Sequence, residues 1–163
     1  MLSTIQRYVK AVRRNHALEH ATVAVLLARH GPTRLAGRAS VDGFVIFGDV
    51  DTDELHASAL EALRRLQSGQ ASLAVTPLCG TNIAVAAFAA AATAAIVLGS
   101  GRGRFANAFV AAMFAVIGTQ PLGLLLQQHV TTSADLVPVS VVGTQWMAGL
   151  MRKVQTSGAL DDA

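Results

Sequence analysis

The chain of 163 residues is 52% hydrophobic and only 14% charged, with a mean hydropathy of +0.46. Soluble domains carry about 25% charged residues, so this composition argues against an ordinary soluble protein. The net charge of +3 comes without any patch of mixed basic and aromatic residues, which argues against nucleic-acid binding. The single cysteine, Cys79, excludes an internal disulfide and fits either a reducing compartment or a site that uses a thiol.

The few charged residues are unevenly distributed along the chain. Only two, Arg102 and Arg104, occur between residues 81 and 129. The preceding part has the composition of a soluble domain. We therefore predict a membrane protein in which a cytosolic α+β cap, residues 1–78, is followed by a transmembrane helical hairpin, residues 79–129.

The first predicted element is a helix from Arg7 to Arg29. Residues 1–15 combine basic and apolar side chains in an amphipathic pattern, which predicts either contact with the membrane surface or a solvated helix start. The helix is expected to end at Gly31, a common C-cap residue, because Pro32 cannot continue it.

Two short strands and a second helix are predicted next. Residues 35–40 and 44–47 are expected to form a β-hairpin, because the Asp-Gly pair between them favours a tight turn. The second helix is predicted over Thr52–Gln67, with Asp51 or the residue after it as N-cap. A short strand is predicted at residues 71–76.

Two apolar runs, at about residues 81–99 and 105–126, are each long enough to cross a membrane, since a span needs about 20 apolar residues. Pro121 is expected to kink the second span. The tails hold eleven Lys and Arg residues and the loop between the spans holds two, so the positive-inside rule places both termini in the cytoplasm. The small residues of the spans favour a homo-oligomer.

The C-terminal region, residues 130–155, is predicted to add a strand and a short helix. Residues 136–142 have the character of a strand, which Pro138 confines to the edge of a sheet. Trp146–Val154 is expected to form a short helix or an interfacial segment, and residues 156–163 a disordered tail. The predicted fold is thus a helix–hairpin–helix–strand cap on a two-helix transmembrane hairpin.

The main functional signal is an H-x-x-E-H segment formed by His16, Glu19 and His20. Positions i and i+4 of a helix are neighbours on one face, so the two imidazoles can bind one metal ion. A carboxylate beside them can take a proton from water, as in the inverted zinc-protease motif. The alternative is a buried polar cluster in which Glu19 pairs with an imidazole or with Arg13 or Arg14.

A zinc site needs at least one more protein ligand, and Cys79 is our first candidate. It lies in a predicted turn at the membrane boundary, although a lone cysteine is often simply a small buried residue. Asp49, Asp51 and Glu54 are rival ligands. Their loop lacks the glycine and the distal glutamate of a calcium loop, so helix capping explains them as well.

Three motifs in a fixed order carry a resemblance to a known family. They are H-A-L-E-H-A-T at His16–Thr22, G-D-V-D-T-D-E at Gly48–Glu54 and P-L-C-G-T-N at Pro77–Asn82, with two spans after them. Over roughly residues 12–143 the chain resembles small bacterial membrane proteins classed as domain of unknown function 6391. It is more distantly similar to a bacterial membrane family with H-G-A-E-H and C-G-T segments that is described as metal-dependent. The resemblance implies a bacterial inner-membrane protein and one composite site, but no established reaction.

Two functions follow as hypotheses. The first is a membrane-bound zinc hydrolase, in particular a metallopeptidase, with zinc on the two motif histidines and Cys79. Glu19 would act as general base, while Thr81 and Asn82 would orient a substrate carbonyl or stabilise its oxyanion. The substrate would be a membrane-proximal peptide or a lipid-linked molecule.

The second hypothesis is a non-catalytic membrane module. Its polar cluster would then be structural, with or without metal, and the protein would act through oligomerisation or partner binding. A thiol enzyme with Cys79 as nucleophile and a motif histidine as base is a third and weaker hypothesis, because the second imidazole would be redundant.

Overall fold

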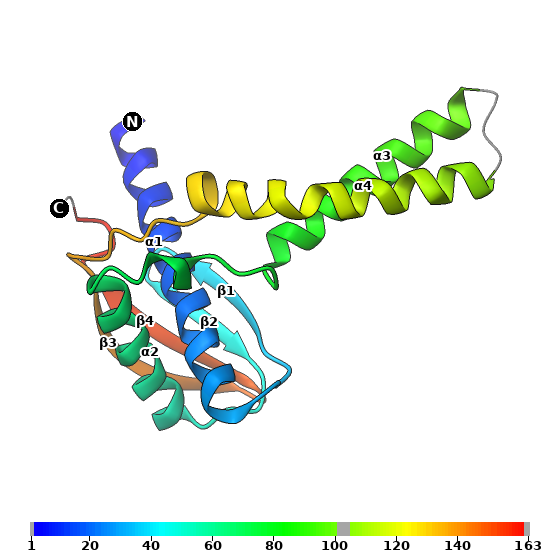
Figure 1. Cartoon of the computed structure of the whole chain (residues 1–163). Coiled ribbons are helices and arrows are strands. Elements are labelled where there is room, and N and C mark those ends of the chain that lie inside the picture. The colour runs from blue at the N-terminus through cyan, green and yellow to red at the C-terminus, as the bar shows by residue number, and fades with distance from the viewer. Residues whose placement is uncertain (1, 101–104, 162–163) are drawn as a thin grey trace. The chain divides into compact units, whose positions relative to one another are not determined.

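The computed structural model describes residues 2–100 and 105–161, and it divides the chain into two compact units. The first unit comprises Met1–Val75 and Gln128–Ala163, and the second comprises Thr76–Gln127. In chain order the elements are α1 (Leu2–His30), β1 (Ala36–Ser40), β2 (Gly43–Phe47), α2 (Thr52–Gln67), the 3-10 helix η1 (Ala71–Ala74), α3 (Gly80–Gly99), α4 (Phe105–Leu126), the π-helix η2 (Gln127–Thr131), β3 (Ser140–Ala148) and β4 (Met151–Ser157) (Figure 1).

The first unit is a two-layer α+β structure. Its sheet has the strand order β1-β2-β4-β3, and all three pairs are antiparallel. Helices α1 and α2 pack against each other and cover one face of the sheet (Figure 1). The core between the layers contains the fully buried side chains of Leu18 and Leu55 from the helices and Phe44, Ile46 and Val154 from the strands. Burial of these apolar faces against one another is the main stabilising term for such a fold.

The predictions for the first β-hairpin and for the second helix are confirmed. The β1–β2 hairpin forms. Gly43 has a φ of 136°, a backbone conformation that residues with a side chain rarely adopt. A Cβ atom there would also overlap the carbonyl of Val154 in the neighbouring strand. Helix α2 has the predicted bounds, and Asp51 caps it by accepting hydrogen bonds from the backbone N–H groups of Asp53 (2.8 Å) and Glu54 (3.2 Å).

Two local predictions are wrong. The strand expected at residues 71–76 is replaced by η1, followed by the segment that leads to α3. The short helix expected at Trp146–Val154 is instead a β-hairpin, in which Gly149 adopts a φ of 51° at the turn and β4 pairs with β2 on its other side. The strand expected at 136–142 begins only at Ser140, and β3 lies at the sheet edge as Pro138 indicated.

The C-terminal tail is ordered as far as the structure describes it, which corrects the expectation of disorder. The guanidinium of Arg14 is completely buried and donates to the carbonyls of Asp135 (2.8 Å), Ala159 (3.1 Å) and Asp161 (2.5 Å) and to the carboxylate of Asp135 (2.7 Å). A buried charge requires such partners, and the tail supplies two of them. Residues 162 and 163 of the predicted tail lie outside the described residues.

The second unit is a pair of packed helices, α3 and α4. Both are long and apolar enough to cross a membrane by length and composition. Their bounds agree with the predicted spans to within one residue, and α4 continues through Pro121 into η2. Residues 101–104 of the predicted loop lie outside the described residues.

The Asp51 cap predicts a pH-dependent contribution to stability. The N–H groups of Glu54 and, to a lesser extent, Asp53 hold the pKa of the Asp51 carboxyl below its ordinary value. Because the folded-state pKa is the lower one, this stabilisation is present above the unfolded-state pKa and is lost as the pH falls through the folded-state pKa. Asp51→Ala should lower the melting temperature at neutral pH and flatten its acid dependence, as measured by circular dichroism in detergent.

Asp51→Asn is the matched control, because asparagine caps a helix without titrating in this range. It should retain most of the neutral-pH stability while losing the Asp51 contribution to the acid dependence. Equal melting temperatures for Asp51→Ala and the unmodified protein across the pH range would contradict the role assigned to this cap.

Candidate metal centre

His16 and His20 lie one turn apart in the middle of α1, as their i,i+4 spacing predicts. Their ring centroids are 4.3 Å apart at an interplanar angle of 61°, and ligand nitrogens of the two rings lie within 4.8 Å of each other. Two nitrogens that share a zinc ion at about 2.1 Å each can be at most about 4.2 Å apart, so the spacing of the two rings is comparable to what a shared ion requires. His20 is buried and His16 is half-buried.

Each ring is oriented by a backbone carbonyl. Nδ1 of His16 bonds to the carbonyl oxygen of Thr131 (2.9 Å), and Nδ1 of His20 bonds to that of Ala74 (2.8 Å). A carbonyl oxygen can only accept, so each Nδ1 carries the proton and each Nε2 carries the lone pair. Metal-ligating histidines are commonly fixed in this way by a second partner. The donor chemistry of the pair therefore fits a metal ion bound through the two Nε2 atoms.

Glu19 shares the same helical turn but faces the sheet. Its side chain is only 6% exposed, and a Cβ atom added to Gly37 of β1 would overlap its carboxylate. Residues one position apart point about 100° apart around a helix, which separates the Glu19 side chain from that of His20. The absence of a side chain at Gly37 is therefore what makes room for the buried carboxylate.

Cys79 and Thr81 stand at the start of α3 in the second unit. Cys79 is the N-cap residue of α3, and its side chain is buried at 5% exposure. The thiol forms no capping hydrogen bond to the helix. Thr81 is half-buried in the first turn of the helix.

Asn82 has a structural use in the second unit. Its Nδ2 donates to the carbonyls of Thr76 and Pro77 (3.3 Å each), and its Oδ1 accepts from Nε2 of Gln127 (2.7 Å). The side chain is 6% exposed, and it lies against Gly123, where a Cβ atom would overlap Oδ1. The amide is thus engaged in tying α3 to α4, which favours a positioning role over direct contact with a substrate.

Gln127 is a key residue that the sequence reasoning missed. It is fully buried, its Oε1 accepts from the backbone N–H of Thr76 (3.0 Å), and its Nε2 donates to the carbonyl of Thr76 (2.9 Å). Its amide thereby bonds to the backbone at Thr76 as a neighbouring strand would. The sequence could have indicated this role, because a glutamine at the end of an apolar helix is costly to bury unless its amide is hydrogen-bonded.

The segments that connect the two units are held by side-chain hydrogen bonds to their backbone. The N-terminal part of the first unit ends at Val75, one residue after Ala74, and η2 returns the chain through Thr131. The carbonyls of these two residues are the ones bound by His20 and His16. Within the second unit, Gln127 binds Thr76, so the two ends of that unit are joined as well.

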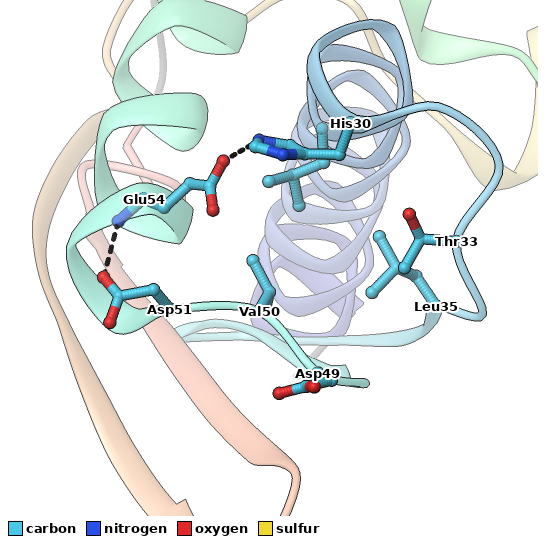
Figure 2. Close-up of a pocket in the computed structure, with 8 residues that line it drawn as sticks. His30, Thr33, Leu35, Asp49, Val50, Asp51 and Glu54 are labelled. Carbon is cyan, nitrogen blue, oxygen red and sulfur yellow. Dashed lines mark hydrogen bonds and ion pairs between the residues drawn. The ribbon is translucent and has the colours of Figure 1, made fainter.

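The rival acidic ligands belong to a separate pocket in the first unit. Figure 2 shows Asp51 on the N-terminal turn of α2 and Glu54 paired with Nε2 of His30. Asp49 also lines this pocket. His30 is the last residue of α1, ten positions after His20, which is about 15 Å along a helix. Capping and ion pairing therefore account for these acids, and the two motif histidines lie elsewhere on the helix.

The contact between Gly123 and Asn82 predicts a sharp difference between two glycines of α4. Gly123→Ala should destabilise the second unit by about 1–3 kcal/mol, because the new methyl group overlaps the Asn82 amide. Gly118→Ala is the control, since a Cβ atom there meets nothing within 4 Å. Unfolding of each variant in detergent, followed by circular dichroism, measures the difference. Equal stability of the two variants would contradict the proposed packing.

Comparison with known proteins identifies the family. Residues 11–143 match the model described as "Domain of unknown function (DUF6391)". An uncharacterized protein of Picosynechococcus sp. strain PCC 7002 is 36% identical over 138 residues, a match that covers 77% of this chain and 67% of that protein. No solved structure matches the chain. The family match spans most of the chain and includes the histidine pair, Cys79 and both apolar helices, so the protein belongs to the DUF6391 family.

Proposed function

We propose that the protein is a membrane-anchored metal-binding protein whose ligands are His16, His20 and Cys79. The observation that carries this proposal is the pair of hydrogen bonds from the two Nδ1 atoms to backbone carbonyls. Together they present two Nε2 lone pairs from consecutive turns of one helix.

Cys79 is supported as third ligand by its chemistry and by its place in the chain. A thiolate is a strong ligand for zinc, and this is the only cysteine. Cys79 follows Ala74, the residue whose carbonyl His20 binds, by five positions, a span of at most about 17 Å when fully extended. A turn in which the N–H of Cys79 donates to the carbonyl of Thr76 (3.4 Å) shortens this tether further.

The ligand set favours zinc. Two imidazoles and one thiolate form one of the three-ligand sets found in catalytic zinc sites, which leave a fourth position open. Oxygen-rich sites select magnesium or calcium instead, and this set lacks carboxylates. Each of the three residues offers one ligand atom of the appropriate type.

The membrane anchor is the α3–α4 hairpin. Both helices meet the length and hydropathy of spans, and few of their residues are buried within the protein. The distribution of Lys and Arg supports a cytoplasmic position for the first unit at the bacterial inner membrane. The alanine-rich surface of α3 suits association between copies of the hairpin in lipid.

A zinc-dependent hydrolase, such as a peptidase acting at the membrane surface, is a second candidate, favoured by the presence of Glu19 in the same helical turn as the histidines and by its burial. Zinc would supply Lewis-acid chemistry at the open position. The Glu19 carboxylate would accept the proton of the attacking water, and the Thr81 hydroxyl would orient the substrate carbonyl. Asn82 would act through its bonds to Gln127, by holding the start of α3 in place.

Metal binding is tested directly by elemental analysis of the protein purified in detergent. We expect about one zinc per chain, and a loss of most of it in His16→Ala, His20→Ala and Cys79→Ser, because three protein ligands are the minimum for a stable site. His56→Ala is the matched control: this histidine bonds to Thr144 at the sheet and should leave zinc content unchanged.

Two results would overturn the metal proposal. One is zinc content at background level in the unmodified protein after reconstitution with zinc. The other is full zinc retention in His20→Ala with its circular dichroism spectrum unchanged. Loss of zinc from Cys79→Ser alone would assign the thiol as a ligand independently of the imidazoles.

The hydrolase candidate is tested with Glu19→Gln, which keeps the shape of the side chain and removes the base. We expect full zinc content and a fall in turnover of at least about 100-fold, the usual loss for a general base. Turnover is measured as fragments released from a library of membrane-inserted peptides in proteoliposomes, identified by mass spectrometry. Equal fragment release by Glu19→Gln and the unmodified protein, or no zinc-dependent release at all, would remove this candidate and leave the metal proposal standing.

A further inference from the structure

The end of η2 and the residues after it are held to α1 by Arg13. Nη2 of its guanidinium donates to the carbonyl of His129 (2.9 Å) and to that of Thr132 (3.0 Å). The backbone carbonyl of Arg13 in turn accepts from the N–H of Ser133 (3.1 Å). All of these atoms belong to the first unit. Hydrogen bonds from a single position of α1 therefore fix the chain on both sides of Thr131.

The carbonyls bound in this way lie at the end of a helix, where they need partners from outside it. The last carbonyls of any helix have no N–H partner within it, and η2 ends at Thr131. Cationic side chains suit such an end, because the carbonyls there carry the negative end of the helix dipole. Arg13 supplies the cation, and between its two bonds Nδ1 of His16 binds the carbonyl of Thr131 (2.9 Å). The acceptor of His16 thus belongs to a segment that Arg13 holds.

The two motif histidines depend on different segments for their hydrogen bonds. Arg13, His16 and His20 lie on one face of α1, at positions i, i+3 and i+7. His16 bonds to η2, whereas the carbonyl bound by His20 belongs to Ala74, the last residue of η1 (2.8 Å). A change that releases η2 should therefore disturb one ring and spare the other. This difference separates a specific role of Arg13 from a general effect on folding.

We infer that Arg13 is a positioning residue for His16. By holding the carbonyls of His129 and Thr132, it keeps the carbonyl of Thr131 in place as the acceptor for Nδ1–H, and this keeps the lone pair of the ring on Nε2. Without that acceptor the imidazole can carry its proton on Nε2, the nitrogen that would bind a metal ion. The consequence for metal affinity rests on the proposed function, whereas the consequence for the position of the proton does not.

The position of the proton is measured on the metal-free, full-length protein in detergent. Long-range proton–nitrogen NMR correlations of isotope-labelled histidine distinguish Nδ1–H from Nε2–H rings at about pH 8.5, well above the ordinary histidine pKa of about 6.5. We expect Nδ1–H on both motif histidines of the unmodified protein. In Arg13→Met, which keeps an apolar side chain and removes the donors, His16 should shift to a mixture that includes Nε2–H, while His20 stays unchanged.

Zinc affinity should follow the position of the proton. Loss of the partner that orients a histidine ligand costs roughly 10–100-fold in metal affinity, and Arg13→Met releases that partner without removing it. We therefore expect the affinity to fall by about tenfold, the lower end of this range, as measured by competition with a chromophoric chelator.

Two variants serve as controls. Both side-chain bonds of Arg13 come from one nitrogen, so the ammonium of Arg13→Lys can replace it and should restore Nδ1–H on His16 and the zinc affinity. Arg7→Met removes another arginine of α1, one that donates to the carbonyl of Leu160 (3.3 Å), and should change neither measurement. Should Arg13→Met fail to fold by circular dichroism, Arg13→Gln takes its place, because it removes the cation and leaves a polar side chain.

The outcomes separate this inference from the metal proposal. An unchanged His16 ring in the folded Arg13 variant, an equal change in His16 and His20, or a folded Arg13→Lys that does not restore Nδ1–H would each overturn the positioning role. Background zinc in the unmodified protein, together with a shift confined to His16 in Arg13→Met, would support the positioning role and overturn the metal proposal alone.

Discussion

The structure depends on two hydrogen bonds between imidazole Nδ1 atoms and backbone carbonyls. His20 binds the carbonyl of Ala74, after which the chain leaves the first unit, and His16 binds that of Thr131, through which it returns. Because a carbonyl oxygen can only accept, the same bonds assign the proton to Nδ1 in both rings. The histidine pair therefore fixes both connecting segments to α1, and in the proposed function it also supplies two of the metal ligands.

Satisfaction of buried polar groups explains most of the remaining organisation. The buried guanidinium of Arg14 recruits carbonyls from the C-terminal tail, and the buried amide of Gln127 pairs with Thr76 and Asn82. Each of these groups would be costly to bury alone, since an unpaired buried polar group loses its hydration without compensation. Small residues complete the scheme: Gly37 leaves room for the Glu19 carboxylate and Gly123 for the Asn82 amide. Each glycine is thus as specific to its position as the polar side chain that it accommodates.

The parts of the fold that could be predicted are those with local causes. Helix α2 has a capping aspartate, the β1–β2 turn has an Asp-Gly pair, and the two spans have continuous apolar runs. The β3–β4 hairpin was missed because β4 carries Arg152 and Lys153 between its apolar residues, and its strand character comes from pairing with β2 about 110 positions earlier. The histidine pair followed from spacing alone. The hydrogen-bond partners of the two histidines could not be predicted, because any residue has a backbone carbonyl. The Asn82–Gln127 bond could not be predicted either, because it joins residues 45 positions apart.

The sheet order has a consequence for how the protein is made. The central pair of the sheet joins β2, from the first third of the chain, to β4, from its last residues. During synthesis both apolar helices are made before β4 exists, so the sheet can be completed only after they have been translated. Until then β2 is an unpaired edge above a partly exposed core, a state that invites aggregation or proteolysis. The order of folding is therefore set by topology: the apolar hairpin is made first, and the sheet of the first unit closes last.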